Sequence, residues 1–180
     1  MLKKLFPKPT PRIIAITAVM IAMEVVLHRF VSIQTPILQI HFGFLPIAAV
    51  AILFGPIYSG IAWASADIIG MLLFPTGGGT WYIGLTISLF LKGIIYGLFL
   101  NSGKKNILLR IIFAALIETV LITLILDTFW LHLYWGNGII VMLPSRFLKC
   151  IVMFPLQIIG IFGIERVLDR YGLKRSFSQR

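Results

Sequence analysis

Six apolar runs, separated by proline, glycine and charged residues, occupy most of this 180-residue chain. A helix needs about 20 mostly apolar residues to cross the hydrocarbon core of a bilayer, so six helices would use roughly 120 residues. Hydrophobic residues make up 59% of the sequence and charged residues 12%, whereas soluble domains have about half and a quarter. The sequence therefore predicts one integral membrane domain, without a separate soluble domain or a long disordered region.

The apolar runs define the expected organisation. We expect an all-α integral membrane protein, a bundle of six transmembrane helices over residues 13–165, between basic tails at 1–12 and 166–180. The second run is the weakest, because thirteen residues more often form a buried or interfacial helix. The basic N-terminus followed by an apolar run is also typical of a signal peptide. An uncleaved first helix is favoured, because that run contains Glu24 and no A-x-A pattern. The six runs cover about 13–27, 42–54, 57–74, 81–100, 107–130 and 141–164.

The positions of lysine and arginine predict the orientation. Of the 16 Lys and Arg residues, twelve lie in the two tails or in the segment 101–110, and such residues accumulate on the cytoplasmic side. Both termini are therefore expected in the cytoplasm, which requires an even number of crossings. Because these charges form no continuous patch, we expect the lipid bilayer and not nucleic acid as a partner. The twelve are Lys3, Lys4, Lys8, Arg12, Lys104, Lys105, Arg110, Arg166, Arg170, Lys174, Arg175 and Arg180.

Ionisable side chains inside the apolar runs indicate a cavity or a partner, because each costs about 2.5–3.5 kcal/mol at a helix centre. Arg146 and Lys149 are three residues apart and share one helix face. With Arg29 at the outer end of the first helix, they could form an anion site that opens outward and binds carboxylates. The alternative is that they pair with Asp127, Glu118 or lipid headgroups.

Asp67 and Lys92 each have two possible roles. The Asp67 carboxylate could accept two hydrogen bonds from an amidine-like edge, such as that of an aminopyrimidine, or it could pair with Lys92. Lys92 lies in the middle of its apolar run, where it could pair with Asp67 or Glu118, or bind a substrate carboxylate.

Two further patterns concern the ligand and partner surfaces. Phe42 and Phe44 flank a glycine at the start of the second run, where their rings could enclose a flat ligand or simply pack between helices. Ala15, Ala18 and Ala22 place small residues along the first helix. Such ridges favour close helix packing in lipid, either within the chain or against another membrane protein.

Several motifs are missing from the sequence. It contains no GxxxxGK[ST] phosphate-binding loop, no HExxH and no GxSxG, so we expect neither ATP binding nor an enzyme. The single cysteine, Cys150, excludes an internal disulfide or a CxxC site. His41 and His132 lack metal-ligand spacing, so no metal site is expected. Glu24 and His28, four residues apart, are expected to form a local pair or to lie at the membrane interface.

An ordered set of short motifs extends from about residue 11 to 169. The motifs are RF-x-SI-x-TP (29–36), FGFLP (42–46), LFGP (53–56), ADIIG (66–70), LLFP (72–75), KGIIYGLFL (92–100), LPSRFLK (143–149) and FPLQ (154–157). Together they resemble the folate-specific S component (FolT-type) of energy-coupling factor (ECF) vitamin transporters. The length, the six helices and the cytoplasmic tails are also similar to that family.

The resemblance implies a multi-pass subunit in a prokaryotic cell membrane that binds folate from outside. Such a subunit delivers folate while docked on a transmembrane T subunit that is driven by two ATPase subunits. It implies no cofactor, since folate is the transported ligand. It also implies that Ala18 and Ala22, extended by Ala15, contact the T subunit.

The ligand roles follow from charge and are a hypothesis. The pterin head is expected among aromatic side chains, and the glutamate tail, with two negative charges, is expected near cations. A different vitamin as ligand and a stand-alone proton-coupled carrier are the alternatives. The candidates for the head are Phe42, Phe44, Trp81 and Tyr96, with Asp67 or Gln157 at its donor edge, and those for the tail are Arg29, Lys92, Arg146 and Lys149.

Overall fold

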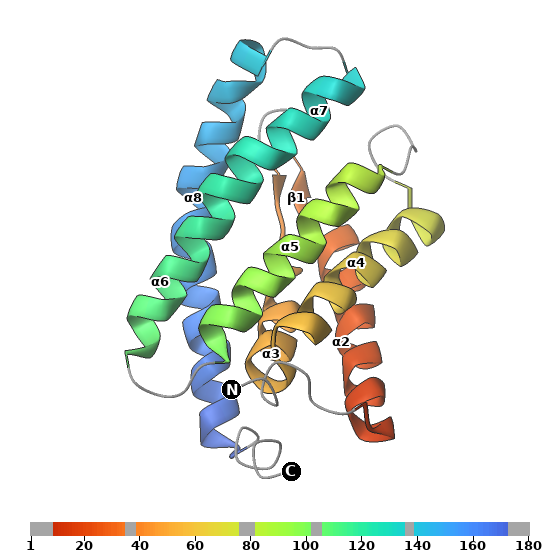
Figure 1. The fold of residues 1–180 in the computed structure, drawn as a ribbon, viewed down its shortest axis with the longest axis vertical. Coiled ribbons are helices and arrows are strands. Elements are labelled where there is room, and N and C mark those ends of the chain that lie inside the picture. The colour runs from red at the N-terminus through yellow and green to blue at the C-terminus, as the bar shows by residue number, and fades with distance from the viewer. Residues whose placement is uncertain (1–8, 35–38, 76–81, 102–105, 136–138, 173–180) are drawn as a thin grey trace.

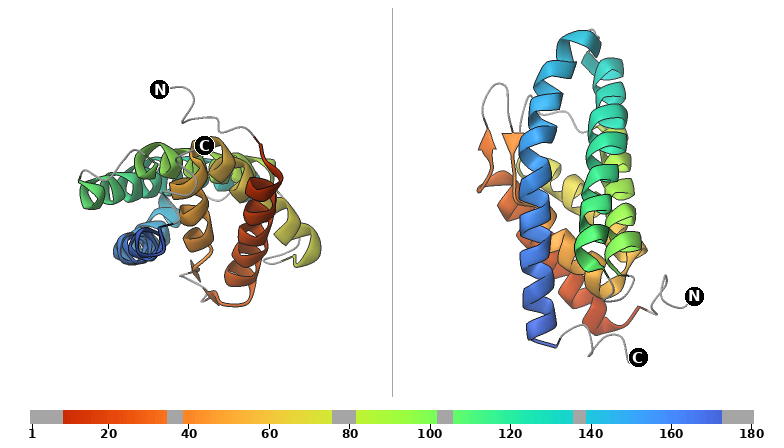
Figure 2. Two further views of the ribbon diagram at one scale, coloured as in Figure 1. Left: turned by 90° about the horizontal axis from the view of Figure 1, so that it is seen from below. Right: turned by 90° about the vertical axis from the view of Figure 1, so that its left-hand side faces the viewer.

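The computed structural model describes residues 9–34, 39–75, 82–101, 106–135 and 139–172. Its helices run alternately up and down a single bundle, as Figures 1 and 2 show. The first helix begins and the last helix ends at the same end of the bundle, which is the lower end in Figure 1. The elements are α2 (Pro11–Arg29), β1 (Ile33–Gln34), β2 (Gln39–Ile40), α3 (Phe44–Phe54), α4 (Pro56–Leu73), α5 (Ile83–Leu100), α6 (Ile107–Ile117), the π-helix η1 (Glu118–Leu126), α7 (Asp127–Trp135) and α8 (Ile139–Arg170).

Five helical stretches in the described part of the chain are long and apolar enough to cross a membrane. They are Pro11–Arg29, Pro56–Leu73, Ile83–Leu100, Ile107–Tyr134 and Leu143–Arg170. The sixth apolar helix, α3, has 11 residues and is therefore about 16 Å long, roughly half of a hydrocarbon core. The chain reaches α3 from the upper end through the antiparallel pair β1–β2.

The short helix α3 forms the centre of the core. Nine of its 11 residues are buried, among them Phe44, Ile47 and Val50, and it contacts α2, α4, α5 and α8. A helix that is apolar on all sides belongs in the middle of a bundle. The sequence-based doubt about the second run is therefore resolved in favour of a buried helix.

Local sequence signals explain where the flanking helices begin. Thr10 caps α2, because its hydroxyl oxygen accepts a hydrogen bond from the Ile13 N–H at 3.4 Å, and Pro11 occupies the first helical position. Gly55 has a φ of 89° between α3 and α4, a backbone conformation that favours glycine. Pro56 then begins α4.

Glycines allow a close contact between α4 and α5. A Cβ atom on Gly93 would lie 2.5 Å from the Ser59 carbonyl oxygen, and one on Gly97 would overlap the backbone of Pro56. The Ser59 hydroxyl donates a 2.7 Å hydrogen bond to the Gly93 carbonyl oxygen across the same contact. Small residues allow this approach between helices in lipid, and the contact sets the position of α5 against α4.

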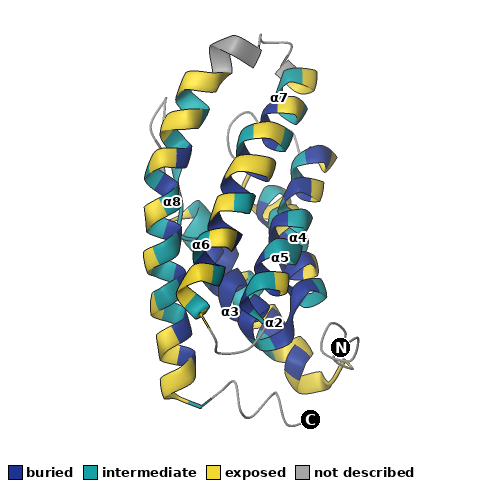
Figure 3. Cartoon of the chain, turned by 60° about the vertical axis from the view of Figure 1, so that its left-hand side comes forward, coloured by how far each residue is buried: buried dark blue, intermediate teal, exposed yellow. Residues whose placement is uncertain are grey.

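The outer surface of the bundle is apolar. Large side chains of η1 and α7 are about half exposed at four-residue spacing, namely Leu121, Ile125, Phe129 and Leu133. Figure 3 shows exposed residues along the outward sides of α8 and of the helices beside it. A surface of this kind suits contact with lipid, whereas water would leave large apolar areas unfavourably exposed.

Candidate functional site

A small pocket lies inside the bundle between α4, α5, η1 and α8, and we name it the inner pocket. Its free volume is about 30 Å³, whereas sites for drug-sized ligands have about 300–1,000 Å³. A ligand of that size therefore requires the lining side chains to move apart. The lining residues are His41, Trp63, Leu89, Lys92, Glu118, Thr119, Thr123, Lys149, Cys150, Met153 and Gln157.

Lys92 is the centre of a buried charged cluster beside this pocket. Its Nζ atom lies 2.9 Å from Asp127 Oδ2 and 3.3 Å from Glu118 Oε1. Lys92, Glu118 and Asp127 are 7%, 2% and 8% exposed. The ammonium group therefore compensates two carboxylates that are removed from water, and their mutual attraction offsets part of the desolvation cost.

The π-helix η1 explains how two carboxylates nine positions apart meet one lysine. In an α-helix, nine residues make 2.5 turns, which would place Glu118 and Asp127 on opposite faces. A π-helix has roughly 4.4 residues per turn, so nine residues make about two turns and return to the same face. The wider turn persists to Asp127, whose N–H bonds the Ile122 carbonyl five residues earlier.

Glu118 and Asp127 differ in how well they are bonded. Both oxygens of Glu118 are hydrogen-bonded, Oε1 by Thr123 at 3.0 Å and Oε2 by Gln157 Nε2 at 2.9 Å. Thr119 also donates to Glu118 Oε2 at 3.3 Å. Asp127 Oδ1, by contrast, has no hydrogen-bond partner among the described residues. Hydrogen bonds therefore hold both carboxylate oxygens of Glu118, whereas Asp127 Oδ1 remains available to accept a hydrogen bond.

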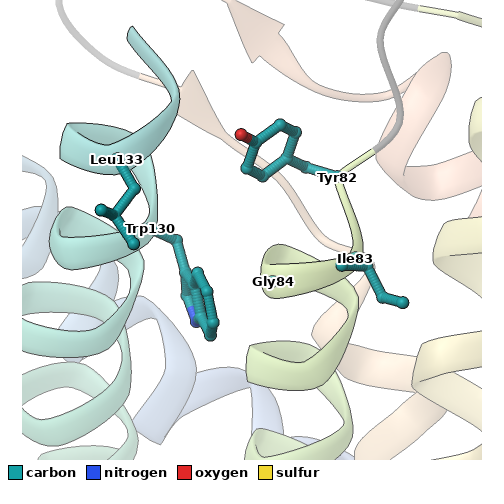
Figure 4. A pocket seen from close by; sticks show the side chains of 5 residues that line it. All are labelled: Tyr82, Ile83, Gly84, Trp130 and Leu133. Atoms are coloured by element: carbon teal, nitrogen blue, oxygen red, sulfur yellow. The ribbon is translucent and has the colours of Figure 1, made fainter. Parts of the chain in front are cut away.

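An aromatic outer cavity of about 410 Å³ opens above the inner pocket, between the start of α5 and α7. Figure 4 shows Tyr82 directed from the start of α5 toward α7, and Trp130 directed from α7 toward Gly84. The Tyr82 and Tyr134 rings also meet edge to face, with centroids 3.8 Å apart. The lining residues are Tyr82, Ile83, Gly84, Trp130 and Leu133.

His41 forms part of the inner pocket from the segment before α3. Its Nδ1 atom is buried without a hydrogen-bond partner among the described residues, and its ring lies 4.5 Å from that of His28. Burial is the main reason that the pKa of His41 is held well below its usual value of 6.5. His41 therefore adds no positive charge to the pocket at neutral pH.

The structure brings three of the predicted ligand residues together. Lys92, Lys149 and Gln157 line the inner pocket, and Tyr96 lies just below, with its ring 5.5 Å from that of Trp63. Lys149 makes no ion pair with Asp127 or Glu118, whereas Lys92 pairs with both carboxylates.

Other predicted residues lie apart from the pocket. Asp67 accepts a 2.6 Å hydrogen bond from the Thr86 hydroxyl and does not pair with Lys92. The Arg29 guanidinium lies against α4, with its Nε atom 3.2 Å from where a Cβ of Gly70 would be. Phe44 is a core residue that packs beside Gly160.

The remaining predicted residues have varied positions. Phe42 is half-buried just before α3, and Arg146 is half-buried on α8, one turn above Lys149. Trp81 lies outside the described residues. Ala15, Ala18 and Ala22 are exposed on the outer face of α2. The predicted local pair is confirmed, since His28 Nδ1 lies 3.2 Å from Glu24 Oε1.

Sequence reasoning assigned no ligand role to several residues of the pocket. Trp63, Thr119 and Thr123 are such residues, and each is an ordinary member of an apolar run. Glu118 and Asp127 carried a signal, because both are carboxylates within an apolar run. That the two carboxylates share one face could not be predicted, because α-helical spacing would place them on opposite faces.

Comparisons with known proteins agree with this architecture. A family model described as "ECF-type riboflavin transporter, S component" matches residues 8–164. The folate transporter FolT of Clostridium novyi (strain NT) is 40% identical over 153 residues, covering 85% of this chain and 87% of the relative. The folate transporter FolT of Leuconostoc mesenteroides subsp. mesenteroides is 25% identical over 179 residues, covering 96% and 95%.

A solved structure is similar as well. The crystal structure of FolT bound with folic acid superposes with a TM-score of 0.77 at 38% identity, covering 85% of this chain and 92% of that one. The agreement confirms the predicted helical membrane fold and the resemblance drawn from the ordered motifs. Because the family model spans most of the sequence, this multi-pass membrane protein belongs to the S components of ECF-type transporters, which are transport subunits and not enzymes.

Proposed function

We propose that this S component binds folate from outside the cell and delivers it while docked on a T subunit with two ATPase subunits. The observation that carries the proposal is the inner pocket, which combines Lys92, Glu118, Lys149 and Gln157. This pocket occurs in a chain 38% identical to a FolT that was crystallised with folic acid.

The charge balance of the inner pocket favours a neutral head group there. Lys92 and Lys149 carry two positive charges, which Glu118 and Asp127 cancel. A dianion placed among them would leave an excess of negative charge in a medium of low dielectric constant, which is costly. The neutral pterin ring is therefore assigned to the inner pocket. There the hydrogen bond between the Gln157 amide and the Glu118 carboxylate can be replaced by hydrogen bonds from these two groups to the donor edge of the pterin.

The glutamate tail of folate is assigned to the outer end of α8. Arg146 lies there, one turn above Lys149 and outside the lining of the inner pocket, and it forms no hydrogen bond or ion pair with another described residue. Eleven residues of helix separate Arg146 from Gln157, or about 16 Å along the axis. An elongated ligand can span that distance with its head inside and its two carboxylates near the rim. The Arg146 guanidinium can bind a carboxylate through two parallel hydrogen bonds.

Riboflavin is the second candidate ligand, because the matching family model carries that name. Titrating the purified chain in detergent with folic acid and with riboflavin, in the absence of nucleotide, separates the two. We expect saturable binding of folic acid at submicromolar concentration. Tight binding of riboflavin without folic acid binding would replace the proposal, and proton-driven folate uptake by vesicles containing this chain alone would favour a stand-alone carrier.

Replacing Arg146 with alanine should weaken folic acid binding by about tenfold or more, because a charge-assisted hydrogen bond contributes about 1.5–3 kcal/mol. Pteroate, which lacks the glutamate, should lose much less. The affinities are measured by equilibrium titration of both ligands against both proteins. Equal losses for the two ligands would reject the tail role of Arg146.

The outer face of α2 is the proposed docking surface for the T subunit. Ala15, Ala18 and Ala22 are exposed there, and large apolar neighbours such as Val19 are 58% exposed. Small residues on an open helix face allow another helix to approach closely.

Replacing Ala18 with leucine should reduce co-purification of the T and ATPase subunits by at least about fivefold, because the added side chain separates the two helices. Folic acid binding by the isolated chain should not change. Val120→Leu, which enlarges a lipid-facing side chain on η1 that is 43% exposed, is the matched control. Full assembly of the Ala18→Leu variant would contradict docking at this face.

A further inference from the structure

Four buried polar atoms on α5 and α7 have no hydrogen-bond partner among the described residues. They are Ser88 Oγ, Asp127 Oδ1, Thr128 Oγ1 and Trp130 Nε1. Ser88, Thr128 and Asp127 are 0%, 3% and 8% exposed. We name these four residues the α5–α7 polar strip. Leaving a polar group buried and unpaired costs about 1–3 kcal/mol, so such a group requires an explanation.

The position of the strip follows from two contacts that enclose it. At its upper end, Trp130 packs on Gly84 in the outer cavity. At its lower end, Lys92 bonds Asp127 beside the inner pocket. Gly84, Ser88 and Lys92 are spaced four residues apart and so share one face of α5. Ser88 therefore lies between the Gly84–Trp130 and Lys92–Asp127 contacts, along helices that run in opposite directions (Figure 1). The strip therefore extends from the outer cavity to the inner pocket.

The available hydrogen-bonding groups define which partner fits. Asp127 Oδ1 can only accept, Trp130 Nε1 can only donate, and the two hydroxyls can do either. The one charged acceptor is Asp127, whose other oxygen is engaged by Lys92. An N–H donor that arrives at this level would pair with a carboxylate oxygen that is already desolvated, which makes the bond strong.

We propose that the α5–α7 polar strip is a further binding subsite, where Asp127 Oδ1 accepts a hydrogen bond from an N–H group in the middle of an elongated ligand. The inference rests on the proposed function, in which the head of folate lies in the inner pocket and its tail near Arg146. The secondary amine that joins the pterin to the benzoyl ring is the group of the required class. The Ser88 and Thr128 hydroxyls complete its surroundings.

The test compares folic acid with 10-methylfolic acid, in which a methyl group replaces the hydrogen of that amine. The full-length protein in detergent should bind folic acid about tenfold tighter or more. In Asp127→Asn the preference should fall to about threefold or less, because the charged acceptor is lost. Ser59→Ala, which removes a buried hydroxyl bonded between α4 and α5, is the matched control and should retain the full preference.

The outcomes separate this inference from the proposed function. Equal binding of both ligands by the unmodified protein would overturn the subsite, as would a preference that persists in Asp127→Asn, since that would be steric. Should Asp127→Asn fail to fold, the Ser88→Ala/Thr128→Val double variant replaces it, and an unchanged preference would again overturn the subsite. If the variants weaken both ligands equally, ordered water and not the ligand occupies the strip. If the unmodified protein binds no folic acid, the proposed function and this inference both fail.

Discussion

Replacing Lys92 with methionine should lower the free energy of unfolding by about 3–5 kcal/mol, because removing one partner of a buried ion pair leaves uncompensated charge. Here the consequence is severe, since Lys92 is the partner of two carboxylates that are 2% and 8% exposed. Without the ammonium group, Glu118 and Asp127 would repel one another across a dry space. Thermal and denaturant unfolding in detergent would measure the loss.

A triple variant provides the control for this prediction. Lys92→Met combined with Glu118→Gln and Asp127→Asn removes the charges together, and most of the lost stability should return. The side-chain shapes are nearly kept, so the recovery would be due to charge. A single Lys92→Met protein that unfolds at the same midpoint as the unmodified protein would show that the cluster contributes little to stability.

Replacing Gly97 with alanine should destabilise the fold by about 3 kcal/mol, the upper part of the usual range for overpacking. The new methyl group would overlap the Pro56 backbone and lie 2.7 Å from the carbonyl carbon of Gly55. Backbone atoms cannot rotate aside as a side chain can, so α4 and α5 would have to separate.

Gly163→Ala is the matched control, because a Cβ atom there would have no neighbour within 4 Å. This variant should be neutral or up to about 1 kcal/mol more stable, since alanine has a higher helix propensity than glycine. Unfolding midpoints of the two variants provide the comparison. Equal stability of Gly97→Ala and Gly163→Ala would contradict the close α4–α5 contact.

The helices were predictable because a helix that crosses a membrane must consist mainly of apolar residues, and such runs are visible in the hydropathy of the sequence. The apolar runs near 57–74 and 81–100 correspond to α4 and α5 within two residues at each end. Gly55 and Pro56 also separate two helices as expected, because each residue has a special backbone conformation. The bilayer thus restricts the membrane-spanning structure to apolar helices, and the sequence shows where these helices begin and end.

The partners across helices were not predictable to the same degree. Lys92 was expected to pair with Asp67 or Glu118, and it bonds Glu118 and Asp127, which is 35 positions away. Which faces meet depends on the rotation of each helix about its axis, and hydropathy determines that rotation poorly in chains that are apolar on most sides. The cytoplasmic location of both termini, the individual roles of the ligand residues and docking on a T subunit stay predictions.

The π-helix has a consequence for how this chain is aligned with others. A segment that makes two turns with nine residues contains about one or two residues more than an α-helix would use for the same number of turns. A homologous chain with an α-helix here would therefore show a gap near residues 118–126. If the gap is left out of the alignment, residues after this point are matched with residues that lie on a different face of the helix. Insertions at this point can change which side chains meet Lys92 without lengthening any loop.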